Sequence, residues 1–288
     1  MKIETYNWWG NGNNEPPPHL KTKKQLAEMG LKPVQAVGII KTQKYDLYLY
    51  DPKNPDSAVP KQKRELSEVQ KAALDKGRRK KQYEAWYREE GRFLKRLMRD
   101  KNDTIDWAQS LLDSNNWVIL DTETTGLSSS DEIVQIGVIN HQGNILLDFF
   151  VKPTIIISDE AIAIHKITNE MVLDAPTFPD IYPKFIEVLQ NKKIIIYNAN
   201  FDIKIIEHCC NLHNLPSPNL KRRSECAMEM YAQFCNEWSN YHDDYRYQPL
   251  NGEHTVISDC LAVLALINKM ASSGKETFDK YKVKFDTR

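Results

Sequence analysis

The sequence predicts an α/β protein in which a mixed β-sheet is flanked by helices and preceded by a smaller α+β region. From residue 117 onward, short apolar runs alternate with amphipathic segments, the pattern of strands alternating with helices. Before that point, the sequence contains one candidate hairpin and one long, highly charged helical segment. With 288 residues, the chain is long enough for one large domain or two modest ones.

The N-terminal region begins with a segment whose composition does not favour packed structure. Residues 1–19 are rich in Gly, Asn and Pro, which favours a flexible or extended arm. Residues 21–29 predict a short helix that is stopped by Gly30. Residues 34–40 and 45–50 predict two strands that form a hairpin.

A long helix is predicted from about residue 67 to residue 100. At about 100° per residue, five basic side chains in its second half share one narrow stripe, opposite an apolar and aromatic side: Lys81, Arg88, Arg92, Lys95 and Arg99. The window 61–101 holds 15 basic and 7 acidic side chains. The stripe is either a solvated helix face or a track for phosphate groups, and charge patterning alone leaves both readings open.

The pattern of alternating strands and helices occupies the rest of the chain. Three early strands are predicted at residues 117–120, 132–140 and 144–151. The later elements, in order, are a helix at 183–190, a strand at 193–198, a helix at 201–212 and a final apolar helix at 256–270. Three strands followed by alternating helices and strands predict a mixed sheet with helices packed on it.

The composition excludes several classes of protein. The 39 basic and 39 acidic side chains cancel, but residues 1–116 hold 23 basic and 16 acidic side chains, and the remainder holds 16 and 23. A basic half joined to an acidic half fits an enzyme that acts on a polyanion. The five cysteines include no C-x-x-C pair, and no apolar run has the length of a signal core or membrane span. We therefore expect a soluble, cytoplasmic protein with reduced thiols.

Two carboxylates at the end of the first predicted strand carry the strongest chemical signal. Asp121 and Glu123 are two residues apart, so a strand directs both to one side of the sheet, whereas Thr122 points away. Two convergent carboxylates repel each other unless cations lie between them, and hard oxygen ligands suit Mg²⁺ or Mn²⁺. A turn at residues 124–126 follows and keeps the pair at the edge of the sheet.

Two later segments repeat this arrangement. Asn198 ends a buried strand, and Asp202 follows at the start of the next helix. His254 and Asp259 are five residues apart, and on one continuous helix their side chains would diverge by about 140°. We therefore expect His254 in the loop before the final helix and Asp259 in its first turns, with both facing one cleft.

The three segments D-x-E, N-x-x-F-D and H-x-x-x-x-D, in this order and spacing, resemble the DEDDh 3′→5′ exonucleases. This DnaQ-like family includes the epsilon proofreading subunit of bacterial replicative polymerase and the ribonuclease T group. The resemblance covers residues 115–272 and implies a ribonuclease H-like fold. Lys166 stands where the family usually has Gly, and Val256 where it often has Ala, but neither change removes a ligand.

The resemblance also implies roles for individual residues. Two divalent ions, Mg²⁺ or Mn²⁺, would be held by Asp121, Glu123, Asp202 and Asp259, and His254 would be the general base. Residues implied to contact the terminal nucleotide are Thr124, Thr125, Gly126, Leu127 as a wedge beneath its base, Glu160, His165 and Asn198.

The expected reaction is hydrolysis of terminal phosphodiesters to 5′-mononucleotides, with single-stranded DNA favoured. Trimming of RNA or short oligonucleotides is an alternative, and so is a nucleic-acid-binding or polymerase-associated module. Residues 20–114 are expected to form a separate basic region that contacts phosphates or a protein partner, and residues 273–288 a tail. Trp8 and Trp9 in the arm either pack on the body of the protein, which we favour, or stack on bases.

Overall fold

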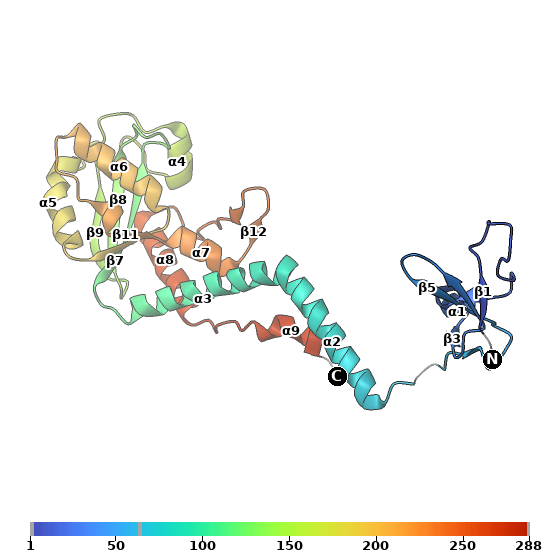
Figure 1. Cartoon of the computed structure of the whole chain (residues 1–288). Coiled ribbons are helices and arrows are strands. Elements are labelled where there is room, and N and C mark those ends of the chain that lie inside the picture. The colour runs from blue at the N-terminus through green and yellow to red at the C-terminus, as the bar shows by residue number, and fades with distance from the viewer. Residues whose placement is uncertain (1–2, 63–64, 287–288) are drawn as a thin grey trace. The chain divides into compact units, whose positions relative to one another are not determined.

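The computed structural model describes residues 3–62 and 65–286, and the chain forms two compact units, residues 1–78 and residues 79–288 (Figure 1). The predicted boundary at residue 114 therefore differs from the observed one. Residues 79–114 belong with the C-terminal unit because their helix contributes to its core. Among the described residues, no helix combines the length and the apolar character needed to cross a membrane.

The N-terminal unit is built on a four-stranded sheet with the order β1-β4-β5-β2: β1 (Glu4–Tyr6), β4 (Gly38–Lys41), β5 (Asp46–Tyr50) and β2 (Lys21–Thr22). The predicted hairpin is confirmed, since β4 and β5 pair in antiparallel register. The predicted helix is α1 (Lys23–Glu28), which begins with a capping box between Thr22 and Gln25. A second sheet pairs β3 (Leu31–Pro33) with β6 (Ala58–Pro60).

The arm at residues 1–19 is not free within its described part, so the prediction of a flexible arm is wrong there. Strand β1 pairs in parallel with β4. Trp9 packs against a small core formed by Leu20, Ile40 and Leu49, as we favoured for the tryptophan pair. Trp8 makes an edge-to-face contact with the Trp9 ring and is 46% exposed.

The C-terminal unit contains a five-stranded mixed sheet with the order β11-β10-β7-β8-β9. Its strands are β7 (Trp117–Thr124), β8 (Ile133–Asn140), β9 (Ile145–Phe150), β10 (Lys193–Ile196) and β11 (Ser224–Cys226). The first three form an antiparallel meander, and β10 pairs in parallel with both β7 and β11. The predicted mixed sheet and its early strands are thus confirmed.

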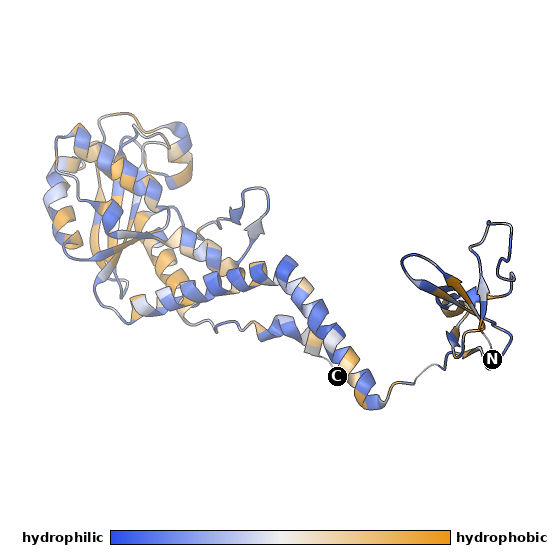
Figure 2. Cartoon of the chain, viewed as in Figure 1, coloured by the Kyte–Doolittle hydropathy of each residue, from blue (hydrophilic) through white to orange (hydrophobic). Residues whose placement is uncertain are grey.

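Alternate residues of β7 supply the two hydrophobic cores. Val118 and Leu120 face a core shared with α5 (Phe178–Leu189) and α6 (Ala199–Leu212). Trp117 and Ile119 face the second core, which is shared with three helices: α3 (Arg92–Leu112), α7 (Ala227–Cys235) and α8 (Val256–Ala271). The apolar colour of the strands in Figure 2 reflects this burial on both faces.

The long predicted helix is interrupted. It runs as α2 (Glu68–Trp86), a π-helical segment at Tyr87–Gly91, and α3, which continues to Leu112. Gly91 is buried, and a β-carbon at this position would lie 2.7 Å from the Tyr87 ring and 3.2 Å from the Trp86 ring. The close approach of these rings explains why a glycine lies at the interruption.

The C-terminal residues also differ from the predicted tail. They form the helix α9 (Asp279–Asp286), preceded by a segment that is fastened to α3. Asn102 accepts a hydrogen bond from the Glu276 backbone N–H and donates one to its carbonyl oxygen, both at 2.9 Å. The ring of Phe278 stacks on that of Trp86 at 6.1 Å. These contacts replace the expected loose end with a docked segment.

Candidate active site

The D-x-E pair lies on the β7 face that is covered by α8. Asp121 and Glu123 continue the alternation of Trp117 and Ile119, so their side chains share the α8 side of the sheet. Asp259 enters from the first turn of α8. The ligand atoms of Asp121, Glu123 and Asp259 all lie within 4.8 Å of one another. Three of the four predicted carboxylates therefore form one cluster.

The fourth carboxylate approaches from the opposite face. Asp202 lies in the first turn of α6, where its backbone N–H donates to the Asn198 carbonyl oxygen at 3.3 Å. The Thr122 hydroxyl group donates a 2.7 Å hydrogen bond to Asp202 Oδ1, and both side chains are buried. Thr122 does point away from its neighbours, as expected, but it points toward Asp202. Sequence reasoning missed this positioning residue, since a lone threonine in a strand carries no signal of its own.

Burial raises the pKa values of the carboxylates in the site, and for Asp121 and Glu123 the charges of their neighbours add to this shift. Burial raises the pKa of Asp121 well above its usual range, and the charges of Asp202, Glu123 and Asp259 raise it further. Burial, followed by the charges of Asp259 and Asp202, raises the pKa of Glu123 to about 8. Burial raises the pKa of Asp202 to about 7, although the Thr122 hydrogen bond opposes the shift. A cation bound here would relieve both the repulsion and the desolvation.

Asp259 offers a donor atom that the described protein residues leave unused. Its Oδ1 atom is buried and has no hydrogen-bond partner among them. Buried carboxylate oxygens are rarely left in this condition without a ligand. Hard oxygen donors of this kind suit Mg²⁺ or Mn²⁺. The orphaned oxygen and the composition of the donor set therefore both fit a divalent metal site.

His254 lies in the loop before α8, as its spacing from Asp259 predicts. The side chain is exposed, and its backbone adopts a left-handed conformation with φ of 56°. Thr255 then caps the helix by accepting a hydrogen bond from the Ser258 backbone N–H. Burial raises the pKa of Asp259, and the nearby His254 charge opposes this shift. The His254 imidazole is therefore close enough to Asp259 to interact with it electrostatically.

The turn after β7 is held rigidly by its own side chains. The Thr124 hydroxyl group donates to the Gly126 carbonyl oxygen at 2.7 Å, and the Thr125 hydroxyl group donates to Asp131 Oδ1 at 2.7 Å. Both threonines are buried, whereas Leu127 is 84% exposed. An exposed leucine on a fixed turn is compatible with the predicted role as a wedge beneath a base.

His165 occupies the last position of α4 (Asp159–His165) and supports the end of β7. Its Nδ1 atom accepts a hydrogen bond from the Ile167 backbone N–H at 3.0 Å, so Nε2 carries the proton and donates to the Thr124 carbonyl oxygen at 3.1 Å. Because both ring nitrogens are engaged and the side chain is buried, this arrangement makes His165 a brace for Thr124. A hydrogen bond from either ring nitrogen of His165 to the terminal nucleotide would require one of these bonds to break.

Two other predicted substrate contacts lie at exposed positions. Glu160 lies in the first turn of α4. Asn198 is the residue before α6, and its carbonyl oxygen accepts the backbone N–H groups of Phe201 and Asp202. Asn198 therefore fixes the position from which Asp202 approaches the site.

The predicted basic stripe is not continuous, and this prediction is wrong as a single stripe. All five side chains are exposed, but Lys81 precedes the π-helical segment and Arg88 lies within it. A π-helical turn contains an additional residue and shifts the phase of the helix by roughly 100°. Arg92, Lys95 and Arg99 follow on α3 at spacings of three and four residues and still share one face.

The comparisons with known proteins agree with the motif analysis. The RNase_T family, described as "Exonuclease", matches residues 118–267. The uncharacterised exonuclease CP81 of Escherichia phage 186 is 36% identical over 172 residues, covering 54% of this chain and 89% of the phage protein. The epsilon subunit of DNA polymerase III from Rickettsia conorii is 40% identical over 97 residues, covering 32% of this chain. Only 42% of that subunit's own length is matched.

Among solved structures, exonuclease X in complex with 5′ overhanging duplex DNA is 26% identical and has a TM-score of 0.40. That similarity covers 57% of this chain and 95% of exonuclease X. The family match spans more than half of the chain and contains every carboxylate of the site together with His254. The chain therefore belongs to the RNase_T family of exonucleases.

Proposed function

We propose that the protein is a two-metal 3′→5′ exonuclease that releases 5′-mononucleotides and favours single-stranded DNA. The observation that carries the proposal is the convergence of Asp121, Glu123 and Asp259 within 4.8 Å, together with Asp202, which is bonded to Thr122 and whose charge raises the pKa of Asp121. The polymerase III epsilon subunits among the relatives support DNA as the substrate.

Asp121, Glu123, Asp202 and Asp259 would hold two Mg²⁺ or Mn²⁺ ions. Such ions activate water as a nucleophile and stabilise the negative charge of the leaving oxygen. The protein contributes the position of each carboxylate, two from β7 and one each from α6 and α8. His254 accepts the proton of the attacking water, and its exposure lets that proton pass to solvent.

The turn at residues 124–127 would receive the terminal nucleotide. Its backbone is fixed by the hydroxyl groups of Thr124 and Thr125, and Leu127 projects from it. A free 3′ end is needed in this arrangement because the strand terminates at the turn. Glu160, on the exposed first turn of α4, is available to a 3′-hydroxyl group.

End-labelled DNA and RNA strands, single- and double-stranded, test this proposal directly. We expect mononucleotide release from the 3′ end with Mg²⁺ or Mn²⁺, fastest on single-stranded DNA, and none in excess chelator. Circular single strands should resist cleavage. Asp121→Ala should abolish release without unfolding the protein, and exposed Glu187→Ala is the matched acidic control. Cleavage of circles or full activity in chelator would refute the proposal.

The N-terminal unit lies outside the residues that the family matches and would serve a separate interaction. We propose a protein partner for this unit. Co-purification of a replication protein with residues 1–78, and not with residues 79–288, would support this role. Equal recovery with both fragments would argue against it.

A further inference from the structure

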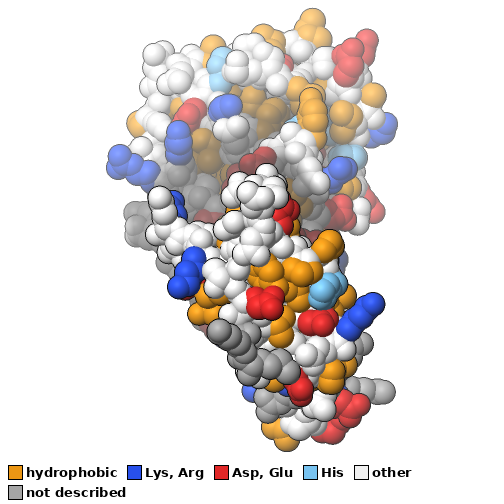
Figure 3. All heavy atoms as spheres, turned by 45° about the vertical axis from the view of Figure 1, so that its right-hand side comes forward, with side chains coloured by type: hydrophobic (Ala, Val, Ile, Leu, Met, Phe, Trp, Pro, Cys, Tyr) orange, Lys and Arg blue, Asp and Glu red, His pale blue; other side chains and the backbone are white. Residues whose placement is uncertain are grey.

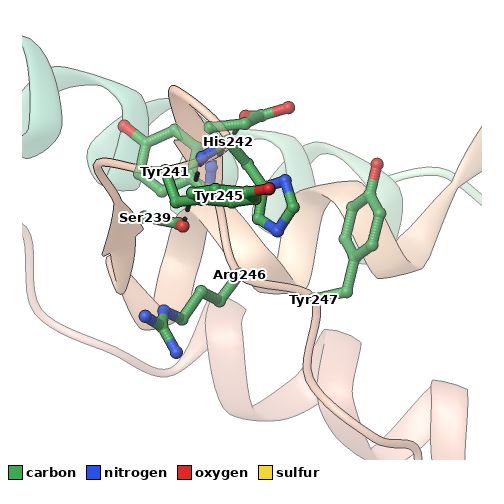
Figure 4. A pocket seen from close by; sticks show the side chains of 7 residues that line it. Ser239, Tyr241, His242, Tyr245, Arg246 and Tyr247 are labelled. Atoms are coloured by element: carbon green, nitrogen blue, oxygen red, sulfur yellow. Dashed lines mark hydrogen bonds between the residues drawn. The ribbon is translucent and has the colours of Figure 1, made fainter.

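A small hairpin between α7 and the His254 loop encloses a cavity that the proposed chemistry does not use. The hairpin consists of β12 (Trp238–Ser239) and β13 (Asp244–Tyr245). The cavity has a volume of about 690 Å³, and its lining is mostly aromatic: Ser239, Tyr241, His242, Asp244, Tyr245, Arg246 and Tyr247 (Figure 4).

The base of the hairpin is anchored on α3. The Tyr245 hydroxyl group donates a 2.9 Å hydrogen bond to Asp100, and the side chain is buried. The Trp238 ring meets the Tyr245 ring edge-to-face at 5.1 Å, and the Arg96 guanidinium lies 5.0 Å from the centre of the Trp238 ring. The floor of the cavity is therefore preorganised, which lowers the entropic cost of binding a ligand.

The rim, in contrast, presents aromatic rings to solvent. Tyr241 is 90% exposed and Tyr247 is 57% exposed. In Figure 4, Tyr247 stands across from Tyr241 and Tyr245, with the His242 ring in the space between them, and Arg246 extends away from these rings. Exposed tyrosines around a fixed aromatic floor provide the stacking surface that unpaired bases use.

The charges around the cavity favour a base inside it and a phosphate outside it. Asp244 lines the cavity, so a phosphate group would be repelled there. Arg246 also lines the pocket, but in Figure 4 its guanidinium extends away from the rings, so the positive charge lies to one side of them. This distribution matches a nucleotide whose base is inserted and whose backbone passes the rim.

A short segment of chain separates the cavity from the candidate active site. Tyr247 and His254 are seven residues apart, so their α-carbons lie within about 25 Å of each other. Between them, the Gln248 carbonyl oxygen accepts a hydrogen bond from the hydroxyl group of Tyr197, which lies one residue before Asn198. A strand with its 3′ end at the carboxylates can therefore reach the hairpin within a few nucleotides.

We propose that this hairpin pocket binds an unpaired base of the substrate strand, a few nucleotides upstream of the 3′ end. The inference rests on the proposed function for the identity of the strand. It adds a second contact that lies outside the catalytic machinery. Strands long enough to reach the pocket bind more tightly than strands that end before it.

A coupling experiment tests the pocket. Fluorescent single strands carry one abasic position, moved stepwise from the 3′ end, and binding is measured in chelator, where the strand is not cut. The wild-type protein should lose about 5- to 150-fold in affinity at one particular position, the value of one base–aromatic stack. Tyr247→Ala should show the same loss with the intact strand and no further loss with that abasic strand. Tyr247→Phe, which retains the ring, should bind as the wild type does.

Catalysis is followed separately with the nitrophenyl ester of thymidine 5′-monophosphate, which is too short to reach the hairpin. Tyr247→Ala should hydrolyse this ester at the wild-type rate. If end-labelled strands are not cut from the 3′ end, the proposed function fails, whereas the coupling still reports on the pocket. The inference would be overturned if Tyr247→Ala bound every strand as tightly as the wild type does. It would also be overturned if the substitution weakened binding of the intact strand and of the abasic strand by the same factor. Paired deoxyribose and ribose strands show which nucleic acid the pocket receives.

Discussion

Gly252 lies against Asp259 so closely that a β-carbon at residue 252 would come within 1.8 Å of the Asp259 Oδ1 atom. The same oxygen is the buried, unpartnered donor of the candidate metal site. The backbone of the loop that contains His254 is therefore in direct contact with Asp259, the predicted metal ligand on α8. Only a residue without a side chain fits between them.

Gly252→Ala should displace either the loop or the Asp259 carboxylate, because the two atoms cannot occupy the same space. We expect a loss of about 10²-fold in kcat, the effect of a displacement near 1 Å in a positioned site. Thermal unfolding should change little, because residue 252 lies in a loop. Gly274→Ala is the control, since a β-carbon there would meet nothing within 4 Å. Unchanged kcat in Gly252→Ala would show that Asp259 is not a ligand in this position.

His254→Ala should lower turnover by about 10²–10⁴-fold, the usual contribution of a general base. Metal affinity, measured by calorimetry, should be retained. His19→Ala provides a matched control, because this histidine is exposed and lies in the N-terminal unit. A loss of metal affinity in proportion to activity would make His254 a ligand instead.

The metal-free protein should lose stability as the pH rises toward 8. Burial, followed by the charges of Asp259 and Asp202, raises the pKa of Glu123 from its usual 4.5 to about 8 in the folded state. Between these two values the folded protein holds a proton that the unfolded chain has released. The stabilisation that this proton provides is complete below about pH 4.5 and is lost as the pH rises through about 8. The Tm in chelator should fall between pH 6 and 8.5, and Mg²⁺ should restore it. Glu123→Gln should flatten this dependence, and a flat profile in the parent protein would contradict the mutual repulsion.

Truncation should distinguish the two proposed domain boundaries. A fragment of residues 79–288 should fold and retain activity on short oligonucleotides, because it keeps the second core intact. A fragment of residues 115–288 should not fold stably, because it lacks Ile105, Ala108 and Leu111, which are buried beneath the sheet. Circular dichroism and thermal unfolding of both fragments measure the difference. A stable fragment 115–288 would restore the boundary at residue 114.

Charge reversal tests phosphate contact by the basic face of α3. Arg92→Glu with Lys95→Glu should weaken binding of long single strands and flatten the log–log salt dependence by roughly 0.7 per lost contact. Lys81→Glu should have no such effect, because the π-helical segment turns Lys81 away from that face. An unchanged salt slope in the double variant would make the face a solvated or protein-docking surface. Figure 3 shows one face of the molecule, on which basic, acidic and hydrophobic side chains are interspersed.

Local sequence predicted much of the site because its signals are short in range. The period of two in a strand places Asp121 and Glu123 on one side, and the start of a helix places Asp202 next to Asn198. The spacing of His254 and Asp259 excluded one continuous helix and thus placed the histidine in the loop. The π-helical segment was not predicted, because the helical periodicity of the sequence continues through it.

The structure explains how the chain accommodates its two departures from the family pattern, Lys166 and Val256. Lys166 stands at a helix end with φ of 63°, a left-handed position that glycine adopts at lower cost. Val256 packs on the α-carbon of Gly137, where a β-carbon would lie 2.6 Å from Val256 Cγ2. The larger residue at position 256 is thus matched by the absence of a side chain on β8.

By itself, the sequence determined which residues could carry the chemistry and on which elements they lie, since hydrophobic periodicity and helix starts are local properties. The tertiary structure alone decided how those residues meet. It brought Asp259 to Asp121 on one face of β7 and Asp202 to Thr122 on the other, and it joined α3 and the C-terminal segment to the catalytic unit. Such contacts depend on the packing of elements far apart along the chain, and no local pattern encodes the distance between them.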